Sequence, residues 1–222
     1  MRSGNAFEDT VSRLLQTIRL GIVQPGSALP SERDLAMRFS VSRDTVRDAI
    51  RELTSAGYVV SRRGRYGGTF VCEVLPTPAP PADLTAAEID DVLGLREILE
   101  VGAVRAAARR PLTATERDGL WQRLTESAAA SPEDYRRLDS RLHLAIAEVA
   151  GAPSLVGLVA DSRSRANDLL DRIPLLARNI VHSNHQHEAV VVAILRGDEE
   201  AAAAAMLEHL AGSAALLRGF LA

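Results

Sequence analysis

The spacing of apolar residues divides the chain into a mixed first part and a helical remainder. Up to about residue 72, apolar side chains recur at helical spacing near 7–20, 31–38 and 42–55, and two short β-rich runs, YVVSR and GTFVCEV, enclose the turn RGRYGG. Farther along, almost every segment is rich in Ala and Leu at a period of about 3.6 residues. Breaks in that period fall at RRPL, AASPED, GAPS and RGDE and around 182–186. The pattern predicts a mainly α-helical protein with one small mixed domain.

A proline-rich segment marks the boundary between the two parts. VLPTPAPPAD, residues 74–83, holds four prolines in ten positions, a composition that breaks helices and favours extended backbone. We therefore expect a first domain over 1–74, a linker over 75–84 and an all-α antiparallel helical bundle over 85–222.

Two helices of the first domain are expected to follow each other after a short turn. Ser31 is placed to cap one helix and Ser42 the next. The second helix has one apolar side, which consists of Val46, Ala49, Ile50 and Leu53. Such a helix pair followed by a β-hairpin is typical of a winged helix-turn-helix domain, here with three helices and a two-stranded wing.

Charge is distributed unevenly between the two domains. The net charge is −3, but the first 72 residues hold 11 Arg against 7 acidic residues, whereas the remainder holds 15 Arg against 22. Only the first domain therefore has the charge excess that suits a nucleic acid. The chain has one cysteine, no basic and apolar leader and no apolar run of membrane-spanning length, so we expect a cytoplasmic protein without a membrane partner.

The stretch SVSRDTVRDAIREL, residues 40–53, admits two interpretations. In a recognition helix, Arg43 and Arg47 would reach bases or phosphates of the major groove. On an ordinary solvated face, the acidic residues would form i, i+3 pairs with the arginines, Asp44 with Arg47 and Asp48 with Arg51. The wing tip SRRGRYGG adds the arginines 62, 63 and 65. That cluster favours DNA contact by Arg43 and Arg47 and leaves Arg51 to the solvated flank.

The first domain carries two motifs that are specific in combination. They read G-x-x-x-P-G-x-x-L-P-S-E-R-x-L-A and V-S-R-x-x-V-R-x-A-I-x-x-L, and both lie within 18–71. This segment resembles the DNA-binding domain of the GntR family of bacterial transcription regulators. The resemblance implies that DNA is contacted by Arg33, Ser42, Arg43 and Arg47 and, on the wing, by Gly64 and Arg65. The arginine cluster of the wing tip adds Arg63 to the expected contacts.

One departure from the family pattern affects the expected operator sequence. Where relatives often have Pro, this chain has Thr45, and Asp44 precedes it. Both positions are expected to face DNA. Because a carboxylate can accept a hydrogen bond from cytosine but repels phosphate, we expect the preferred operator to differ from that of relatives.

Histidines are the informative residues of the helical domain. His143, His187 and His209 lie on three different predicted helices, each in phase with apolar neighbours, and Asp139 precedes His143 by one turn. His185 points about 200° away from His187 around the same helix. A single inward histidine is ordinary core, and an inward aspartate needs a partner for its charge. Three imidazoles and a carboxylate in one interior, however, are typical ligands of a divalent transition metal.

The helical domain also has a family resemblance. GLREILEVGAVRAAARR, D-x-x-x-H-x-x-I-A and the later histidine motifs lie within 90–218 and resemble the FCD ligand-binding domain of the FadR subfamily. The resemblance implies a metal held by Asp139, His143, His187 and His209, with zinc as the first choice and nickel, manganese or iron as alternatives. An open coordination position would admit a small carboxylate effector. The residues expected to contact it are Arg96, Arg163 and Asn167, with Arg165 as a further candidate.

These observations predict a ligand-responsive transcription regulator and not an enzyme. A homodimer would bind double-stranded DNA at a two-fold symmetric operator as a repressor, and the effector would change its affinity for that operator. Two alternatives stay open. A helical-bundle enzyme could use the same metal to activate water, although the paired Glu-x-x-His motifs of such bundles are missing. The metal could also be purely structural.

Overall fold

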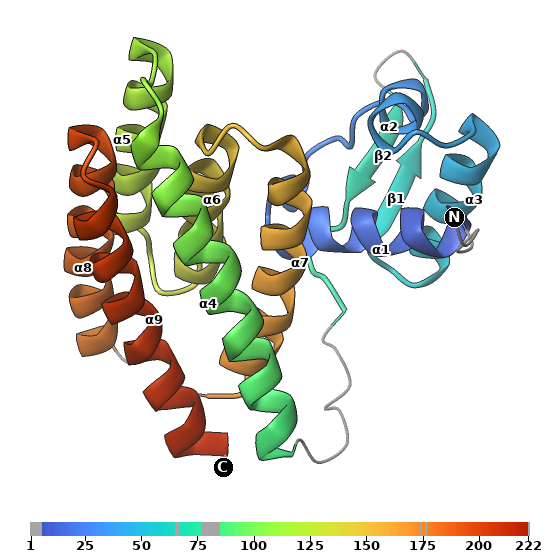
Figure 1. Cartoon of the computed structure of the whole chain (residues 1–222). Helices are drawn as coiled ribbons and strands as arrows, with labels where there is room; N and C mark the ends of the chain where they lie inside the picture. Colours follow the sequence, from blue (N-terminus) through green and yellow to red (C-terminus); the bar gives the residue numbers. More distant parts are fainter. Residues whose placement is uncertain (1–5, 65–66, 77–84, 174, 176, 222) are drawn as a thin grey trace. The chain divides into compact units, whose positions relative to one another are not determined.

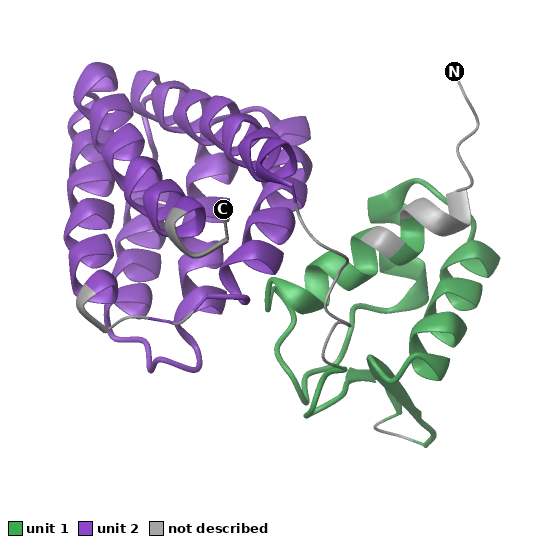
Figure 2. Ribbon diagram, turned by 90° about the horizontal axis from the view of Figure 1, so that it is seen from below, with its two compact units in different colours: residues 1–80 green, residues 81–222 purple. Residues whose placement is uncertain are grey.

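The computed structural model describes residues 6–64, 67–76, 85–173, 175 and 177–221. The chain divides into two compact units, 1–80 and 81–222 (Figure 2). Each unit has its own hydrophobic core. Among the described residues, no helix combines the length and the apolar character needed to cross a membrane.

The first unit is a three-helix domain with a β-hairpin (Figure 1). Its elements are α1 (Ala6–Arg19), α2 (Glu32–Phe39), α3 (Arg43–Ser55), β1 (Val59–Arg62) and β2 (Gly68–Val71). Helices α1 and α2 pack against α3, and α3 contacts β1. The two strands are antiparallel, in a register that runs from Val59 opposite Val71 to Arg62 opposite Gly68. This arrangement confirms the predicted winged helix-turn-helix fold.

Local hydrogen bonds explain why α2 and α3 begin where they do. The Ser31 hydroxyl accepts from the Asp34 amide at 3.2 Å, and the Ser42 hydroxyl accepts from the Thr45 amide at 3.0 Å. Ser40, between the helices, has a left-handed backbone with φ of 56° and ends α2. The inner side of α3 is buried as expected, through Val46, Ala49, Ile50 and Leu53.

The second unit consists of helices throughout its described part. They are α4 (Ala86–Arg109), α5 (Ala114–Ala128), α6 (Tyr135–Val149), α7 (Pro153–Leu170), α8 (Ala177–Arg196) and α9 (Glu199–Leu221). Helix α4 packs against α6, α7, α8 and α9, and α9 lies alongside both α4 and α8 (Figure 1). The predicted all-helical bundle is therefore confirmed, with α4 in contact with most of its neighbours.

The buried stripe of α4 contains two charged residues. Apolar side chains occupy it at both ends, among them Ile89, Val104 and Ala107. In the middle of the same stripe, Arg96 and Glu100 are each only 2% exposed. Because buried charges must be paired, we expect partners for both residues in the interior of the bundle beside α4.

One expected break between helices is wrong. Helix α8 runs without interruption through 182–186, and the connection lies instead between Leu170 and Ala177. The run HSNHQH is polar enough to resemble a loop. Three of its side chains, Ser183, Gln186 and His187, are nevertheless buried on the inner side of α8. Polarity here marks an interior polar site and not a turn.

Candidate metal centre and nucleic-acid surface

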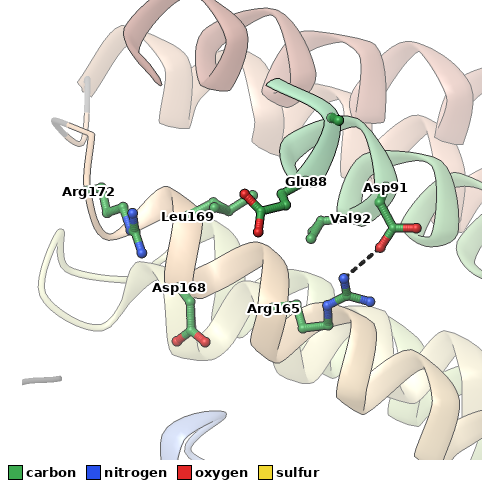
Figure 3. Close-up of a pocket in the computed structure, with 8 residues that line it drawn as sticks. Glu88, Asp91, Val92, Arg165, Asp168, Leu169 and Arg172 are labelled. Carbon is green, nitrogen blue, oxygen red and sulfur yellow. Dashed lines mark hydrogen bonds and ion pairs between the residues drawn. The ribbon is translucent and has the colours of Figure 1, made fainter. Parts of the chain in front are cut away.

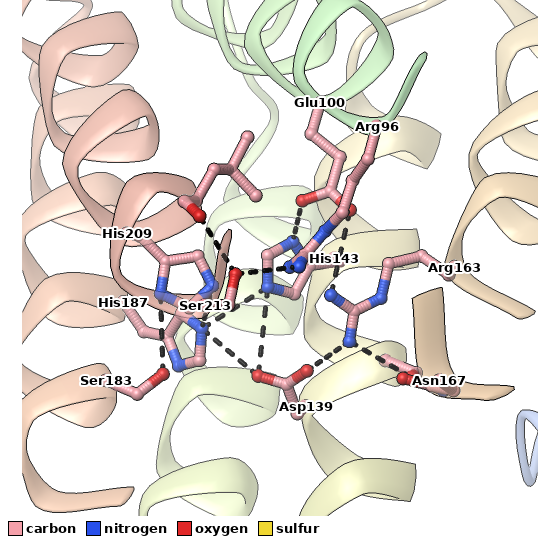
Figure 4. A network of polar contacts seen from close by, with 12 residues as sticks. Arg96, Glu100, Asp139, His143, Arg163, Asn167, Ser183, His187, His209 and Ser213 are labelled. Atoms are coloured by element: carbon pink, nitrogen blue, oxygen red, sulfur yellow. Dashed lines mark hydrogen bonds and ion pairs between the residues drawn. The ribbon is translucent and has the colours of Figure 1, made fainter. Parts of the chain in front are cut away.

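Four potential metal ligands from three helices meet inside the second unit (Figure 4). Asp139 and His143 lie one turn apart on α6, His187 comes from α8, and His209 comes from α9. All four are buried, with exposed fractions between 2% and 8%. The structure thus brings together the residues that the sequence placed in one interior.

The ligand atoms converge on one point. Nε2 of His187 lies 3.3 Å from Nε2 of His143, 3.3 Å from Nε2 of His209 and 3.2 Å from Oδ1 of Asp139. Nε2 of His143 is 3.8 Å from the same carboxylate oxygen. Each residue offers one ligand atom, and these atoms all lie within 4.8 Å of one another.

This donor set fits a divalent cation. Ligand atoms about 2.0–2.1 Å from a tetrahedral zinc ion lie roughly 3.3 Å from one another, close to the spacing of these nitrogens. A neutral imidazole carries a proton on only one nitrogen, so three Nε2 atoms that face one another cannot all be satisfied by mutual hydrogen bonds. A bound cation would satisfy all three lone pairs together with the carboxylate.

The electrostatic environment keeps Asp139, His187 and His209 in the forms that bind metals. Burial lowers the pKa of His187 to about 3, and it lowers the pKa of His209 well below the ordinary value. Burial alone would raise the pKa of Asp139, but the charged Arg163 guanidinium beside it holds the pKa below its usual range. Neutral imidazoles and an ionised carboxylate are the protonation states that metal binding requires.

Sequence reasoning missed Glu100, which lies beside the cluster. Its Oε2 is 2.6 Å from Nδ1 of His143, and its Oε1 accepts a hydrogen bond from Nε of Arg96 at 3.1 Å (Figure 4). The spacing of Glu100 along the sequence could have indicated that it is buried. Glu100 lies one turn after Arg96 and three residues before Ala103, in phase with the apolar stripe of α4.

The three expected effector contacts all lie near this cluster (Figure 4). Arg163 on α7 is completely buried and donates from Nη2 to Asp139 and, at 3.2 Å, to Ser140. Asn167, one turn later, donates to the Ser140 hydroxyl at 2.9 Å. Arg96 also donates to the Ser213 hydroxyl at 3.0 Å. These contacts show that Arg163 is already engaged with a candidate ligand of the metal.

Arg165 belongs to a different part of α7. It lies in a surface pocket between the start of α4 and the end of α7, where it pairs with Asp91 at 2.7 Å (Figure 3). Glu88, Asp168 and Arg172 also line this pocket. The structure therefore separates Arg165 from Arg163 and from the histidines.

The first unit exposes several arginines on its helix pair and wing. Arg33 lies in the first turn of α2, Arg43 begins α3 and Arg63 follows β1, and all three are exposed. In the described part of the chain, none of the three has a side-chain hydrogen bond or ion pair, so their guanidinium groups are available to an incoming phosphate or base. Gly64, at φ of 108°, starts the turn of the wing. Arg65 lies outside the described residues.

Helix α3 has the ion pairs of a solvated helix face and also an arginine that is available to DNA. Arg47 donates to Asp44 at 3.0 Å and lies 3.4 Å from Glu32, while Arg51 donates to Asp48 at 3.0 Å. Ser42 and Thr45 are joined through their hydroxyl groups at 2.7 Å. The expected ion pairs are therefore present in the protein alone, and Arg43 is the cation of this helix without one.

The fold and site define a two-part protein, with a winged helix suited to DNA and a helical unit built around a buried polar cluster. Comparison with known families identifies its class. Residues 7–71 match the model of bacterial regulatory proteins of the gntR family, and residues 91–212 match the FCD domain. The chain belongs to the GntR family of transcription regulators, as a member that carries an FCD domain.

Individual relatives agree with this assignment. The chain is 32% identical to an Escherichia coli protein named as a regulatory protein of the L-lactate dehydrogenase operon, over 94% of this chain and 84% of that protein. It is 29% identical to the transcriptional regulator LutR of Bacillus subtilis, over 91% and 97% of the two chains. The solved structure of E. coli McbR/YncC shares the fold, with a TM-score of 0.58 at 20% identity over 97% of this chain and 98% of that one.

Membership in this family decides between two of the functional classes considered above. The relatives named here are transcription regulators, so the chain is a DNA-binding regulator and not an enzyme. The helical-bundle metalloenzyme is therefore set aside. The buried cluster of Asp139 and the three histidines must instead be explained within a regulator.

Proposed function

We propose that this regulator represses transcription from a two-fold symmetric operator as a cytoplasmic homodimer. In this proposal, Asp139, His143, His187 and His209 hold a divalent metal, and a small organic acid binds next to it. Binding of the acid favours one arrangement of the helical domain and thereby weakens operator binding. The change in operator affinity cannot exceed the difference in effector affinity between the two arrangements.

One observation carries the proposal. Three imidazole nitrogens and one carboxylate oxygen lie within 4.8 Å of one another in the buried interior of the helical unit. A polar cluster of this kind lowers the stability of a fold unless something compensates it. A resident cation provides that compensation, and a vacant coordination position would give an acidic effector a reason to bind there.

Metal analysis of the protein tests the first part. The protein is purified without chelator, and bound metal is measured by mass spectrometry beside His187→Ala and His209→Ala variants. We expect one divalent ion per chain, zinc in the first place, and a large loss in both variants. His185→Ala is the matched control, because His185 is exposed on the same helix. Equal metal content in all four proteins, or none in any, would contradict the proposal.

Buried polar atoms beside the cluster support an anionic effector. Nε and Nη1 of Arg163 and Oδ1 of Asn167 have no hydrogen-bond partner among the described residues. Unpaired buried donors are costly, and a carboxylate oxygen would accept a charge-assisted hydrogen bond from either of these guanidinium nitrogens. We therefore propose that Arg163 and Asn167 contact the effector, with Arg96 nearby.

The relative named for the L-lactate dehydrogenase operon suggests the first compound to try. Fluorescence anisotropy would follow operator binding by the zinc-loaded protein while L-lactate is added, with D-lactate, pyruvate and malonate tested in parallel. We expect at least one of these acids to weaken operator binding. The same titration on metal-depleted protein should give no response.

The purely structural metal makes a different prediction. If the ion only stabilises the bundle, its removal should lower the melting temperature, but no carboxylate should change operator affinity at any metal load. A loss of stability without an effector response across a broad panel of acids would favour this alternative.

A further inference from the structure

Glu100 is a second buried carboxylate that the proposed ligand set does not use. It lies in the middle of α4 and is 2% exposed. Its Oε1 accepts from Nε of Arg96 and lies 3.7 Å from Nη1 of Arg163. Its Oε2 lies 2.6 Å from Nδ1 of His143, the ring nitrogen on the side opposite the cluster. The carboxylate therefore connects two arginines to one candidate ligand.

The contact determines which nitrogen of His143 carries the proton. Neither Oε2 of Glu100 nor Nδ1 of His143 has a hydrogen bond to any other group in the described part of the chain. The two atoms lie 2.6 Å apart, which is within ion-pair distance, although the ring N–H is not aligned for a hydrogen bond to this oxygen. With the proton on Nε2, the Nδ1 lone pair would face an anionic oxygen. With the proton on Nδ1, the lone pair of Nε2 faces the cluster.

Two arginines flank Glu100 and favour its ionised form, which strengthens this effect. Its Oε1 lies 3.1 Å from Nε of Arg96 and 3.7 Å from Nη1 of Arg163. An ionised carboxylate can accept a hydrogen bond from the imidazole N–H but has no proton to donate. It also makes Nε2 of the imidazole a stronger donor toward a cation.

The other two histidines lack such a partner. Nδ1 of His209 lies 3.4 Å from the neutral hydroxyl of Ser183. Nδ1 of His187 has no hydrogen-bond partner among the residues described. Of the three imidazoles, His143 is thus the one whose Nδ1, the nitrogen directed away from the cluster, faces a charged group in the described part of the chain.

We propose that Glu100 is a positioning residue of the metal centre, which keeps Nε2 of His143 unprotonated and directed at the ion. The inference rests on the proposed metal site, but it concerns a residue that does not touch the ion. Arg96 and Arg163 take part by neutralising Glu100, which would otherwise be an isolated buried charge.

Zinc affinity of matched variants tests the role of Glu100. The affinity for Zn²⁺ is measured by competition with a chromophoric chelator in the wild type, Glu100→Gln and Glu97→Gln. Glu97 is exposed on the same helix, so its substitution makes the same chemical change outside the interior. We expect Glu100→Gln to bind Zn²⁺ about 10–100-fold more weakly and Glu97→Gln to bind it as the wild type does. Wild-type affinity in Glu100→Gln would overturn the inference.

A second measurement needs neither zinc nor a variant of Glu100. The ¹⁵N chemical shifts of the histidine rings in the metal-free wild type report the tautomer, and a His143→Asn variant assigns the signal. We expect the proton of His143 on Nδ1, and a proton on Nε2 would overturn the inference even if Glu100→Gln fails to fold. Failure of the wild type to bind Zn²⁺ would instead contradict the proposed function, so the two failures are distinguishable.

Discussion

Arg163 holds one oxygen of the Asp139 carboxylate while the other oxygen faces the histidines. Nη2 of Arg163 donates to Oδ2, and Oδ1 lies 3.2 Å from Nε2 of His187. The guanidinium also lies 3.7 Å from Glu100. One buried cation therefore stabilises both carboxylates of the interior and orients the one that faces the cluster.

Removing this cation should destabilise the helical unit strongly. Arg163→Met leaves two buried carboxylates with only Arg96 to neutralise them, and breaking a buried ion pair from one side costs roughly 3–5 kcal/mol. We expect a loss of that order in the free energy of unfolding of the metal-free protein, measured with urea. Added Zn²⁺ should restore part of it, because the ion takes over the neutralisation of Asp139.

Arg165→Met provides the control on the same helix. Its partner Asp91 is exposed, and exposed ion pairs contribute at most about 1 kcal/mol. Similar losses in the two variants would show that Arg163 contributes no more than a surface arginine.

The buried histidines should make the metal-free protein sensitive to mild acid. In the unfolded chain a histidine has a pKa of about 6.5, whereas the pKa of His187 in the folded protein is about 3. Between these values the unfolded chain binds a proton that the folded protein does not. The contribution of His187 to the free energy of unfolding therefore falls as the pH falls below about 6.5, by at most about 2 kcal/mol between pH 7 and pH 5.

Urea unfolding in the presence of a chelator at pH 7.5 and at pH 5 measures this loss. His187→Asn cannot take up the proton, so its stability should depend less steeply on pH. His185→Asn, an exposed position two residues earlier, should keep the dependence of the wild type. The carboxylates act in the same direction only at lower pH, since the pKa values of Asp139 and Glu100 lie below their ordinary range.

Much of the fold could be predicted from the sequence because helix caps and apolar spacing depend on residues that are close together in the chain. Ser31 and Ser42 cap the helices of the DNA-binding unit through their own neighbouring amides, and the apolar side of α3 follows from spacing alone. The break expected around 182–186 was wrong for the opposite reason. His187 and Ser183 face polar residues of other helices, and the local sequence does not indicate such contacts.

The candidate site shows the same limit. Asp139 and the three histidines are chemically distinctive, so phase and residue type were enough to place them together. Glu100 and Arg163 are common residue types, and their roles depend on the contacts between α4, α6 and α7. A charged residue in phase with a buried stripe is the sequence signal that would have found Glu100.

Arg43 should contribute more to operator binding than Arg51. Both are exposed arginines of α3, but Arg51 is paired with Asp48, whereas Arg43 at the start of the helix has no partner in the described part of the chain. The first residues of a recognition helix reach base edges, and such a contact contributes about 1–3 kcal/mol. We expect Arg43→Ala to weaken operator binding roughly 10–100-fold in anisotropy titrations. Arg51→Ala should change it little, and equal effects would place the contact elsewhere on the helix.

Asp44 should influence which operator is preferred. It is exposed at the start of α3, where it carries a negative charge toward DNA, and it pairs with Nη1 of Arg47 at 3.0 Å, while Nη2 of Arg47 lies 3.4 Å from Glu32. In Asp44→Ala, Arg47 is released from this partner and the repulsion of phosphate is removed. We therefore expect tighter binding to random DNA and a steeper dependence on salt, because one more arginine becomes available to the backbone.

The same substitution should change the base preference at one position of each half-site. A carboxylate at the helix start can accept from cytosine N4, and alanine cannot. Selection of binding sites from a random library, carried out with the wild type and Asp44→Ala, measures the preference directly. Asp48→Ala is the control, because it frees Arg51 in the same way one turn farther from the helix start. If both variants select the wild-type sequence, Asp44 acts only by holding Arg47, and the base preference is set by other residues of α3.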